Sequence, residues 1–281
     1  LIHFGHCWQD CDDKNELTPG KWAKGSINVS NIKESFYKWF EMLKNQGWNL
    51  IYWHNHDQPR VISHYGDDSE LHNQSGKMLC QSLYLMPGTP IVYQGEEIGM
   101  TNVDYEKLND FRDVEVFTEY DNFMSFGATH DVAMQALRDR ARDNARSPYQ
   151  WDSSQNAGFS NNTPLINVNR NYNEINLEQQ LEDPNSIYTC YKKIFSSRKE
   201  LKISDGTVKF LNIDDNKTFI YINKTPTAEL LSISNFTNSR VTVNLDIKIE
   251  GFELLLTNYE EKELSTGIKL LPYESLVYIK K

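Results

Sequence analysis

Strand-like and helical patterns alternate over the first 200 residues of this chain, and this alternation restricts its fold more than any other feature. The apolar runs at 1–4, 48–53 and 89–93 are strand-like, and apolar residues recur at helical spacing over 30–43 and 73–86 between them. Strands that alternate with helices form βαβ units, in which the strands lie parallel. We therefore predict an α/β fold with a parallel sheet for this part of the chain.

The pattern changes after Leu201. Helices are expected at 128–140 and 186–201. The segment at 100–130 is long and polar, and the segment at 143–176 is an Asn-, Ser- and Pro-rich loop. Beyond Leu201, short β-rich runs alternate with turn residues and no helical pattern continues. The runs lie at 208–211, 219–222, 230–233, 241–245, 252–256 and 276–279. These patterns predict two domains, an α/β part at 1–202 and an antiparallel β-sandwich at 203–281.

Composition excludes some classes of partner. The 281 residues carry a formal net charge of -10, and the basic residues are scattered, which argues against nucleic acid or an anionic membrane as a partner. No apolar run approaches the roughly 18 residues that a membrane-spanning helix needs, and no signal peptide is visible. Aromatic residues make up 12% of the chain, which would suit sugar stacking, although an ordinary core explains them more simply.

The cysteines predict neither a disulfide framework nor a metal site. There are four in the chain, which is few for this length, so we expect a reduced, cytoplasmic protein. His3, His6, Cys7 and Cys11 could be drawn as a metal site. Their spacing lacks a CxxC pair and no second ligand pair follows, so we predict no metal here.

One strand-like run ends in an unusual set of polar residues. The run at 48–53 continues into His54-Asn55-His56-Asp57-Gln58-Pro59-Arg60. A carboxylate, an imidazole and an amide thus follow the end of the strand directly, and Pro59 ends it. In α/β barrels the carboxyl ends of the strands carry the chemistry, so we expect a functional site at Asp57.

Together with later segments, this motif resembles glycoside hydrolase family 13, and more narrowly its oligo-1,6-glucosidase and α-glucosidase subgroup. The resemblance lies in 55–60, in Gly88-Thr89-Pro90 through Asn102, and in Arg142-Asp143-Asn144-Ala145-Arg146 through Trp151. Arg112-Asp113-Val114-Glu115 and Pro272-Tyr273-Glu274 fit the same subgroup. The motifs occur in the family's order along the whole chain.

The resemblance implies a fold and an activity. The fold would be a (β/α)8 TIM barrel, with the three predicted strands as strands six to eight and the helix at 186–201 as the last barrel helix, followed by a β domain. The activity would be retaining hydrolysis of terminal α-1,6- or α-1,4-glucosidic bonds. The substrates would be short α-glucosides such as isomaltose or maltose. No cofactor is implied, and any calcium site of the family would lie upstream of this chain.

The resemblance also implies roles for five residues. Asp57 matches the third catalytic carboxylate, which binds sugar hydroxyls and stabilises the oxocarbenium-like transition state. His56 matches a histidine that binds hydroxyls of the same sugar, and Arg142 matches an arginine that closes the pocket. Glu115 and Lys21 match positions that contact the next sugar.

Structural alternatives accompany these roles. Asp57 could cap a strand end, His56 could be an ordinary core histidine, and Arg142 could form an ion pair with Asp113 or Asp139. The two residues assigned to the next sugar could simply be solvated surface groups.

Four further charged residues in the motifs are expected to be structural. Glu96 and Glu97 follow the predicted eighth strand, where the family does not place its catalytic carboxylates. Arg60 and Arg146 are expected to be architectural arginines.

The chain departs from the subgroup's pattern at three places, which affects fine specificity. Phe4-Gly5-His6 stands where Phe-Glu-His is usual, Ile91 replaces a tyrosine, and Ser147-Pro148-Tyr149 replaces Thr-Pro-Met.

Two catalytic carboxylates of the family have no counterpart in the sequence. The nucleophile follows strand four and the acid/base follows strand five, and no Gly-Phe-Arg-x-Asp segment occurs. Because the chain starts at Leu1 and enters a strand at once, we expect it to be the C-terminal half of a longer enzyme. Alone it should be inactive, with open strand edges.

Two other functions stay open at this point. One is trehalose-6-phosphate hydrolase, which the subgroup contains and which would act on trehalose 6-phosphate. The other is a truncated, non-catalytic remnant or sugar-binding fragment.

Overall fold

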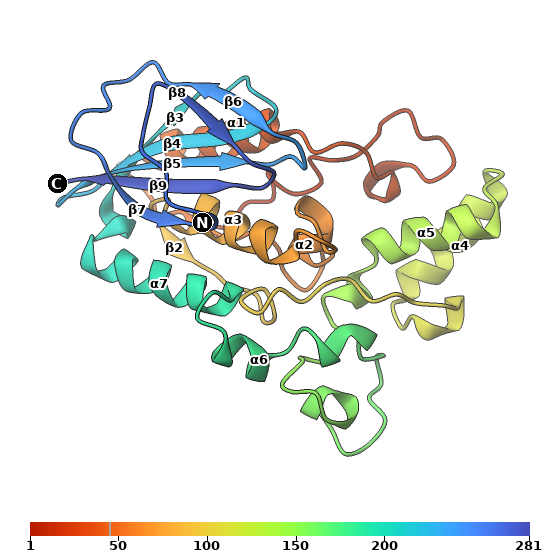
Figure 1. Ribbon diagram of the computed structural model, residues 1–281. Coiled ribbons are helices and arrows are strands. Elements are labelled where there is room, and N and C mark those ends of the chain that lie inside the picture. Colours follow the sequence, from red (N-terminus) through yellow and green to blue (C-terminus); the bar gives the residue numbers. More distant parts are fainter. Residues whose placement is uncertain (45) are drawn as a thin grey trace.

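Two layers pack against each other in the computed structural model, which describes residues 1–44 and 46–281 (Figure 1). One layer holds the helices α1 (Val29–Leu43), α3 (His72–Tyr84) and α7 (Ile187–Glu200). The other is a five-stranded antiparallel sheet formed by the C-terminal part of the chain. A single apolar cluster joins the helices to the inner face of this sheet.

Local sequence explains why these helices form where they do. Asn28 caps α1 by accepting a hydrogen bond from the backbone N–H of Asn31 at 3.0 Å, and Ser186 caps α7 by accepting one from Thr189 at 3.1 Å. Ile32 and Phe36, four residues apart on α1, are fully buried in the apolar cluster. The helices predicted at 30–43, 73–86, 128–140 and 186–201 are therefore confirmed within two residues at each end.

The parallel sheet is present but much shorter than predicted. β1 (Leu50–Ile51) pairs in parallel with β2 (Thr89–Pro90). The segment at 1–4 runs beside β1, since Leu50 donates its N–H to the carbonyl of Leu1 at 3.0 Å, but it forms no regular strand. The predicted lengths of all three strands were wrong. A strand is stabilised by neighbours on both sides, and the segments at 1–4 and β2 each have one neighbour among the described residues.

Three helices lie where no helix was predicted. α4 (Val114–Ser125) lies in the long polar segment at 100–130 and packs against α5 (His130–Arg140), burying Val116 and Phe123. α2 (Val61–Tyr65) and α6 (Leu177–Glu182) are short. Short 3₁₀ turns lie at Gly20–Trp22, Leu108–Asp110, Arg142–Asn144, Gln155–Gly158, Arg170–Asn173 and Ile203–Asp205.

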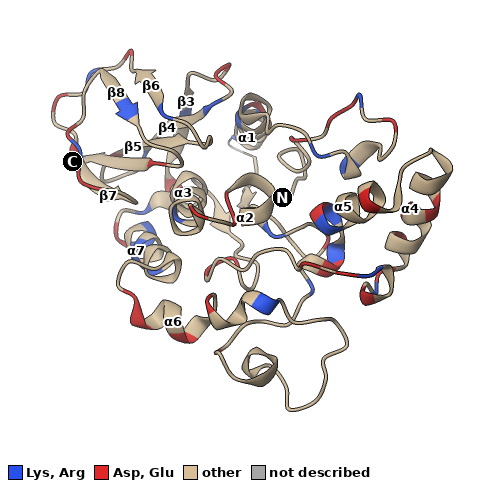
Figure 2. Cartoon of the chain, turned by 45° about the vertical axis from the view of Figure 1, so that its right-hand side comes forward, with Lys and Arg blue, Asp and Glu red and all other residues tan. Residues whose placement is uncertain are grey.

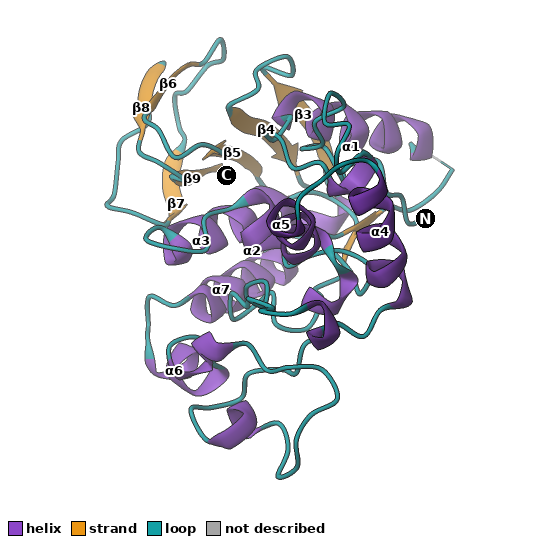
Figure 3. Ribbon diagram, turned by 90° about the vertical axis from the view of Figure 1, so that its right-hand side faces the viewer, coloured by secondary structure: helices purple, strands orange, loops and turns teal. Residues whose placement is uncertain are grey.

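The C-terminal part is all-β and antiparallel, and its strands gather on one side of the helices (Figure 3). The order in the large sheet is β3-β4-β5-β9-β7, and β6 pairs with β8 in a second sheet. Apolar side chains on the outer face of the large sheet share a cluster with β6 and β8. The strands are β3 (Thr207–Leu211), β4 (Thr218–Lys224), β5 (Glu229–Asn235), β6 (Val241–Asn244), β7 (Glu253–Thr257), β8 (Gly267–Leu270) and β9 (Ser275–Lys280). Only β8 was missed by the sequence patterns.

Two buried cations hold the helical layer to the β part. Lys33 on α1 donates to the carbonyl oxygens of Asn212, Asp215 and Thr218 at 2.6 to 2.8 Å. Arg198 on α7 donates to the carbonyl of Gly88 at 2.6 Å and to the hydroxyl of Ser204. The domain boundary at 202/203 stays a prediction. None of the described helices is both long and apolar enough to cross a membrane.

Candidate active site

Asp57 lies on an exposed turn beyond the carboxyl end of β1. The chain is buried from Ile51 through His54 and then emerges. The side chain of Asn55 accepts the N–H of Asp57 at 2.8 Å, which closes a turn and holds the carboxylate outward. The Asp57 side chain is 49% exposed, so it does not cap the strand but faces solvent.

Two arginines from one short turn hold this carboxylate. Arg146 Nη2 lies 2.7 Å from Asp57 Oδ1, and Arg142 Nη1 lies 3.7 Å from the same oxygen. Both come from the segment that begins with the 3₁₀ turn Arg142–Asn144. The structure thus brings Asp57 and Arg142 together as the resemblance implied, and it adds Arg146, which the sequence reading had treated as architectural.

Asp113 forms ion pairs with both arginines. Its Oδ2 lies 3.0 Å from Arg146 Nη1, and its Oδ1 accepts from Arg142 Nη2 at 2.8 Å. Burial raises the pKa of Asp113, but the backbone N–H of Glu115 and the Arg142 guanidinium outweigh it, so the pKa lies below its usual value. Asp113 is therefore ionised at neutral pH and pairs with both arginines. The structural alternative for Arg142 was an ion pair with Asp113 or Asp139, and Arg142 does pair with Asp113.

Lys21 and Glu115 form the next part of the site. Lys21 Nζ lies 2.6 Å from Glu115 Oε1, and Arg142 Nε lies 3.2 Å from Glu115 Oε2. The Lys21 ammonium also lies 4.7 Å from the centre of the Trp22 ring. The two residues are therefore continuous with the Asp57 cluster through Arg142. Figure 2 shows basic and acidic positions interspersed along α5 and the segments around it.

His56 lies beside Asp57, and its ring is mostly exposed to solvent. Its side chain is 66% exposed, and its Nε2 lies 3.4 Å from Asp57 Oδ2. Its carbonyl oxygen accepts from Arg146 Nε at 2.9 Å, which ties the turn to the arginine pair. The alternative of a core histidine was wrong for His56. The buried histidine of this segment is His54.

Glu96 and Arg60 are buried behind the site. Glu96 Oε1 accepts from the hydroxyls of Tyr84 and Tyr191 at 2.5 and 2.6 Å, and its Oε2 lies 3.0 Å from His54 Nδ1. Arg60 donates to backbone carbonyls on two later loops. Neither can reach a substrate directly, so both support the turn that carries Asp57.

Glu97 is also engaged by structural hydrogen bonds. Its Oε1 accepts from the Tyr149 hydroxyl at 2.7 Å, and its Oε2 accepts from the N–H of Gly95 at 2.9 Å.

No group of three or more His, Cys, Asp or Glu residues is placed to hold a metal ion among the described residues. In the group of His3, His6, Cys7 and Cys11, the Cys7 Sγ lies 3.6 Å from His6 Nε2 and 4.0 Å from the Tyr52 hydroxyl. Burial raises the pKa of the Cys7 thiol to about 11, so the thiol is protonated at neutral pH.

Comparison with known proteins identifies the family of the chain. The family model for the alpha-amylase catalytic domain matches residues 4–206. The chain belongs to the alpha-amylase family.

Its relatives in that family are glycoside hydrolases. Oligo-1,6-glucosidase of Halalkalibacterium halodurans is 40% identical over 268 residues, covering 93% of this chain and 48% of the relative. Trehalose-6-phosphate hydrolase of Bacillus subtilis is 39% identical over 264 residues, covering 92% and 47%.

A solved structure shows the same relation in three dimensions. The crystal structure of Bacillus licheniformis trehalose-6-phosphate hydrolase superposes with a TM-score of 0.91 at 36% identity, covering 100% of this chain and 51% of that one. The chain thus spans about half the length of the relatives it matches.

The sequence contained a signal for the positions of Arg146 and Asp113, two residues to which the resemblance assigned no contact with a sugar. Arg142 and Arg146 are four residues apart in one motif, so a short helical turn places both on the same side. Asp113 immediately precedes α4 as its N-cap, where a carboxylate is expected.

Proposed function

We propose that Asp57 is the transition-state-stabilising carboxylate of a retaining α-glucosidase, and that this chain forms one side of the active site. The observation that carries the proposal is an exposed carboxylate, held by two arginines, beyond the carboxyl end of a parallel strand pair. A fixed anion at this position stabilises positive charge that develops on a sugar ring, and accepts hydrogen bonds from its hydroxyls.

The neighbours have distinct parts in this proposal. His56 is free to hydrogen-bond a hydroxyl of the same sugar, because its ring is mostly exposed. Arg142 spans from Asp57 to Glu115 and so closes one wall. Glu115 and Lys21, at the far end of that wall, would contact the next sugar.

We further propose that additional parallel strands complete this site. Large apolar side chains at the strand-like segments are left exposed, namely Ile2, Phe4, Trp48 and Ile91. Such side chains would be covered inside a closed barrel. The added strands would supply the nucleophile and the acid/base, which in retaining enzymes lie about 5 Å apart. The chain alone is proposed to be inactive.

The charges at the site favour a neutral sugar over a phosphorylated one. A phosphate needs surplus positive charge, and here each cation has an anionic partner within salt-bridge distance. The three cations are Lys21, Arg142 and Arg146, and the three anions are Asp57, Asp113 and Glu115. Trehalose-6-phosphate hydrolase is kept as the second candidate, because a hydrolase of that name is 39% identical. Comparing isomaltose, maltose and trehalose 6-phosphate as substrates of the complete protein would decide between the two.

Two measurements test the proposed role of Asp57. The purified chain should show no turnover of an aryl α-glucoside, and measurable hydrolysis would contradict its incompleteness. In the complete protein, Asp57→Asn should lower kcat by at least about a hundredfold with an unchanged circular dichroism spectrum. Asp104→Asn is the matched control, since the Asp104 side chain is 81% exposed and lies outside the cluster. Near-normal rates for Asp57→Asn would refute the assignment.

A further inference from the structure

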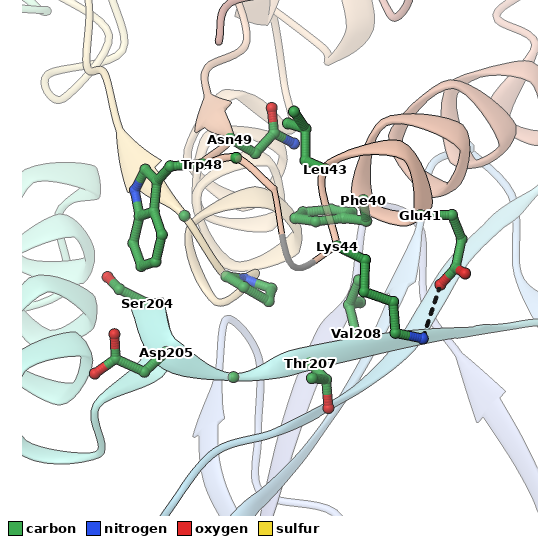
Figure 4. Close-up of a pocket in the computed structure, with 14 residues that line it drawn as sticks. Phe40, Glu41, Leu43, Lys44, Trp48, Asn49, Ser204, Asp205, Thr207 and Val208 are labelled. Carbon is green, nitrogen blue, oxygen red and sulfur yellow. Dashed lines mark ion pairs between the residues drawn. The ribbon is translucent and has the colours of Figure 1, made fainter.

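Trp8 lies on the same side of the parallel strands as Asp57. The segment at 1–4 runs parallel to β1, and Trp8 follows its carboxyl end, as Asp57 follows the carboxyl end of β1. A cavity of about 380 Å³, drawn in Figure 4, lies at the opposite, amino ends of the strands, and none of its lining residues belongs to the Asp57 cluster. Trp8 is therefore placed beside the candidate site, and the cavity is not.

The ammonium group of Lys21 lies near two indole rings. Its Nζ is 4.7 Å from the centre of the Trp22 ring and 5.8 Å from that of the Trp8 ring, which is within the range of a cation–π interaction. Trp22 is buried, whereas Trp8 is only partly buried. The salt bridge of Lys21 to Glu115 at 2.6 Å occupies one of three N–H donors. The two rings therefore restrict the direction of the donors that remain for a ligand.

A buried ion-pair group supports the Trp8 ring. The Arg140 guanidinium lies 5.7 Å from the ring centre, and the centre of the His64 ring lies 5.4 Å from it. Asp10 holds both groups, since its carboxylate oxygens lie 2.8 Å from Arg140 Nη2 and 2.8 Å from His64 Nε2. These three side chains are at most 4% exposed. Trp8 thus connects a rigid buried group to the ammonium of Lys21.

The backbone of Trp8 has a conformation that a bulky residue rarely adopts. Its φ is 61°, in the left-handed region that is unfavourable for tryptophan and freely open to glycine. The flanking backbone is held, because the Tyr65 hydroxyl donates to the carbonyl of His6 at 2.8 Å and Asn28 donates its N–H to the carbonyl of Gln9 at 2.6 Å. A glycine would fit this turn without strain, so a tryptophan here indicates that the ring itself has a function.

We propose that Trp8 is a positioning residue for the sugar next to the cleaved bond, and that it acts through the Lys21 ammonium. The inference rests on the proposed function, in which Lys21 and Glu115 contact that sugar, and extends the site to a residue outside the motifs. The face of an indole ring carries partial negative charge, so it attracts the ammonium and repels a phosphate. The sugar that Trp8 and Lys21 select is therefore a neutral pyranose.

Steady-state kinetics of the complete protein with two substrates tests the inference. Isomaltose has a sugar next to the cleaved bond, whereas α-glucosyl fluoride has only fluoride there. Trp8→Gly removes the ring together with the backbone strain, and it should raise KM for isomaltose by about two- to fivefold with kcat unchanged. Its KM and kcat for α-glucosyl fluoride should stay within about 1.5-fold of those of the unsubstituted protein, because no second sugar is bound.

A double-mutant cycle with Lys21→Met shows whether Trp8 acts through Lys21. Lys21→Met should raise KM for isomaltose at least as much as Trp8→Gly, and the double variant should resemble Lys21→Met alone. Trp8→Phe keeps an aromatic face for the ammonium, so its KM should lie within about twofold of that of the unsubstituted protein. Phe126→Ala is the matched control and should change neither parameter, because Phe126 is 51% exposed and lies at the opposite end of α4 from Glu115.

The outcomes separate this inference from the proposed function. Thermal melting shows whether each variant folds, and Trp8→Leu, which keeps most of the volume but has no aromatic face, replaces Trp8→Gly if that variant does not. No hydrolysis of α-glucosyl fluoride by the unsubstituted protein would refute the proposed function and this inference with it. If that substrate is hydrolysed, an unchanged KM of Trp8→Gly for isomaltose, or effects that multiply in the double variant, would refute this inference alone. A larger loss with trehalose 6-phosphate than with isomaltose would show that the selected sugar is not neutral.

Discussion

Replacing Arg140 with methionine should destabilise the chain by about 3–5 kcal/mol, because it leaves the buried Asp10 carboxylate without its guanidinium partner. Arg140 Nη1 and Nη2 lie 3.1 and 2.8 Å from the two carboxylate oxygens of Asp10. The side chains are only 1% and 2% exposed. The pair ties α5, which leads into Arg142, to the segment after residues 1–4.

The size of this loss should depend on pH. Burial raises the pKa of Asp10, but His64 and Arg140 together outweigh it, so its pKa lies below the usual value. A carboxyl whose folded pKa is lowered contributes stability above its unfolded pKa of about 3.9, and this contribution is lost as the pH falls. Without Arg140 the folded pKa of Asp10 rises. The deficit of the variant should therefore be large at pH 7 and shrink toward pH 4.

Urea denaturation, followed by tryptophan fluorescence and circular dichroism at both pH values, measures the deficit. Lys38→Met is the matched control, since Lys38 Nζ lies 3.0 Å from Glu34 but the two side chains are 69% and 42% exposed. Its loss should be at most about 0.5 kcal/mol, because an exposed pair gains little. An Arg140→Met deficit below about 1 kcal/mol, or equal to that of the control, would refute the reasoning.

Two further predictions concern Lys33, which joins α1 to the β part, and the loop after β2. Burial lowers the pKa of Lys33 to about 8, so between about pH 8 and 10.5 the unfolded chain binds more protons than the folded chain. The free energy of unfolding should therefore rise with pH in this range, and Lys33→Met should lack this contribution. Identical pH profiles of the two proteins in urea titrations would contradict the prediction. Gly95→Ala should destabilise the chain by about 1–3 kcal/mol more than Gly127→Ala. Both glycines have a positive φ, of 90° and 92°, so the backbone strain of the two variants is similar. At Gly95 the new methyl group would also collide with Met100 Sδ, whereas nothing lies within 4 Å of it at Gly127. Equal melting temperatures for the two variants would show that space at Gly95 does not matter.

Helix positions and the β part followed from local sequence. The spacing of Ile32 and Phe36 and the caps at Asn28 and Ser186 determine α1 and α7 without reference to the rest of the molecule. Alternation in β4 is equally local, since Phe219 contributes to the cluster with the helices while the next residue contributes to the outer cluster.

Elements that depend on a distant partner were missed or misjudged. α4 buries only Val116 and Phe123, so its polar sequence shows little periodicity, and its packing on α5 stabilises it. β8 is a strand because it pairs with β6. The lengths of β1 and β2 depend on how many strands lie beside them.

The same division holds for the candidate site. By itself, the sequence placed His56 and Asp57 directly after a strand, because a motif at a strand end carries that information locally. Only the tertiary structure decided that Arg146 pairs with the Asp57 carboxylate and that Asp113 pairs with Arg146 in turn. Those contacts join segments 33 and 89 residues apart, and ion-pair geometry over such separations is fixed by packing and not by local sequence.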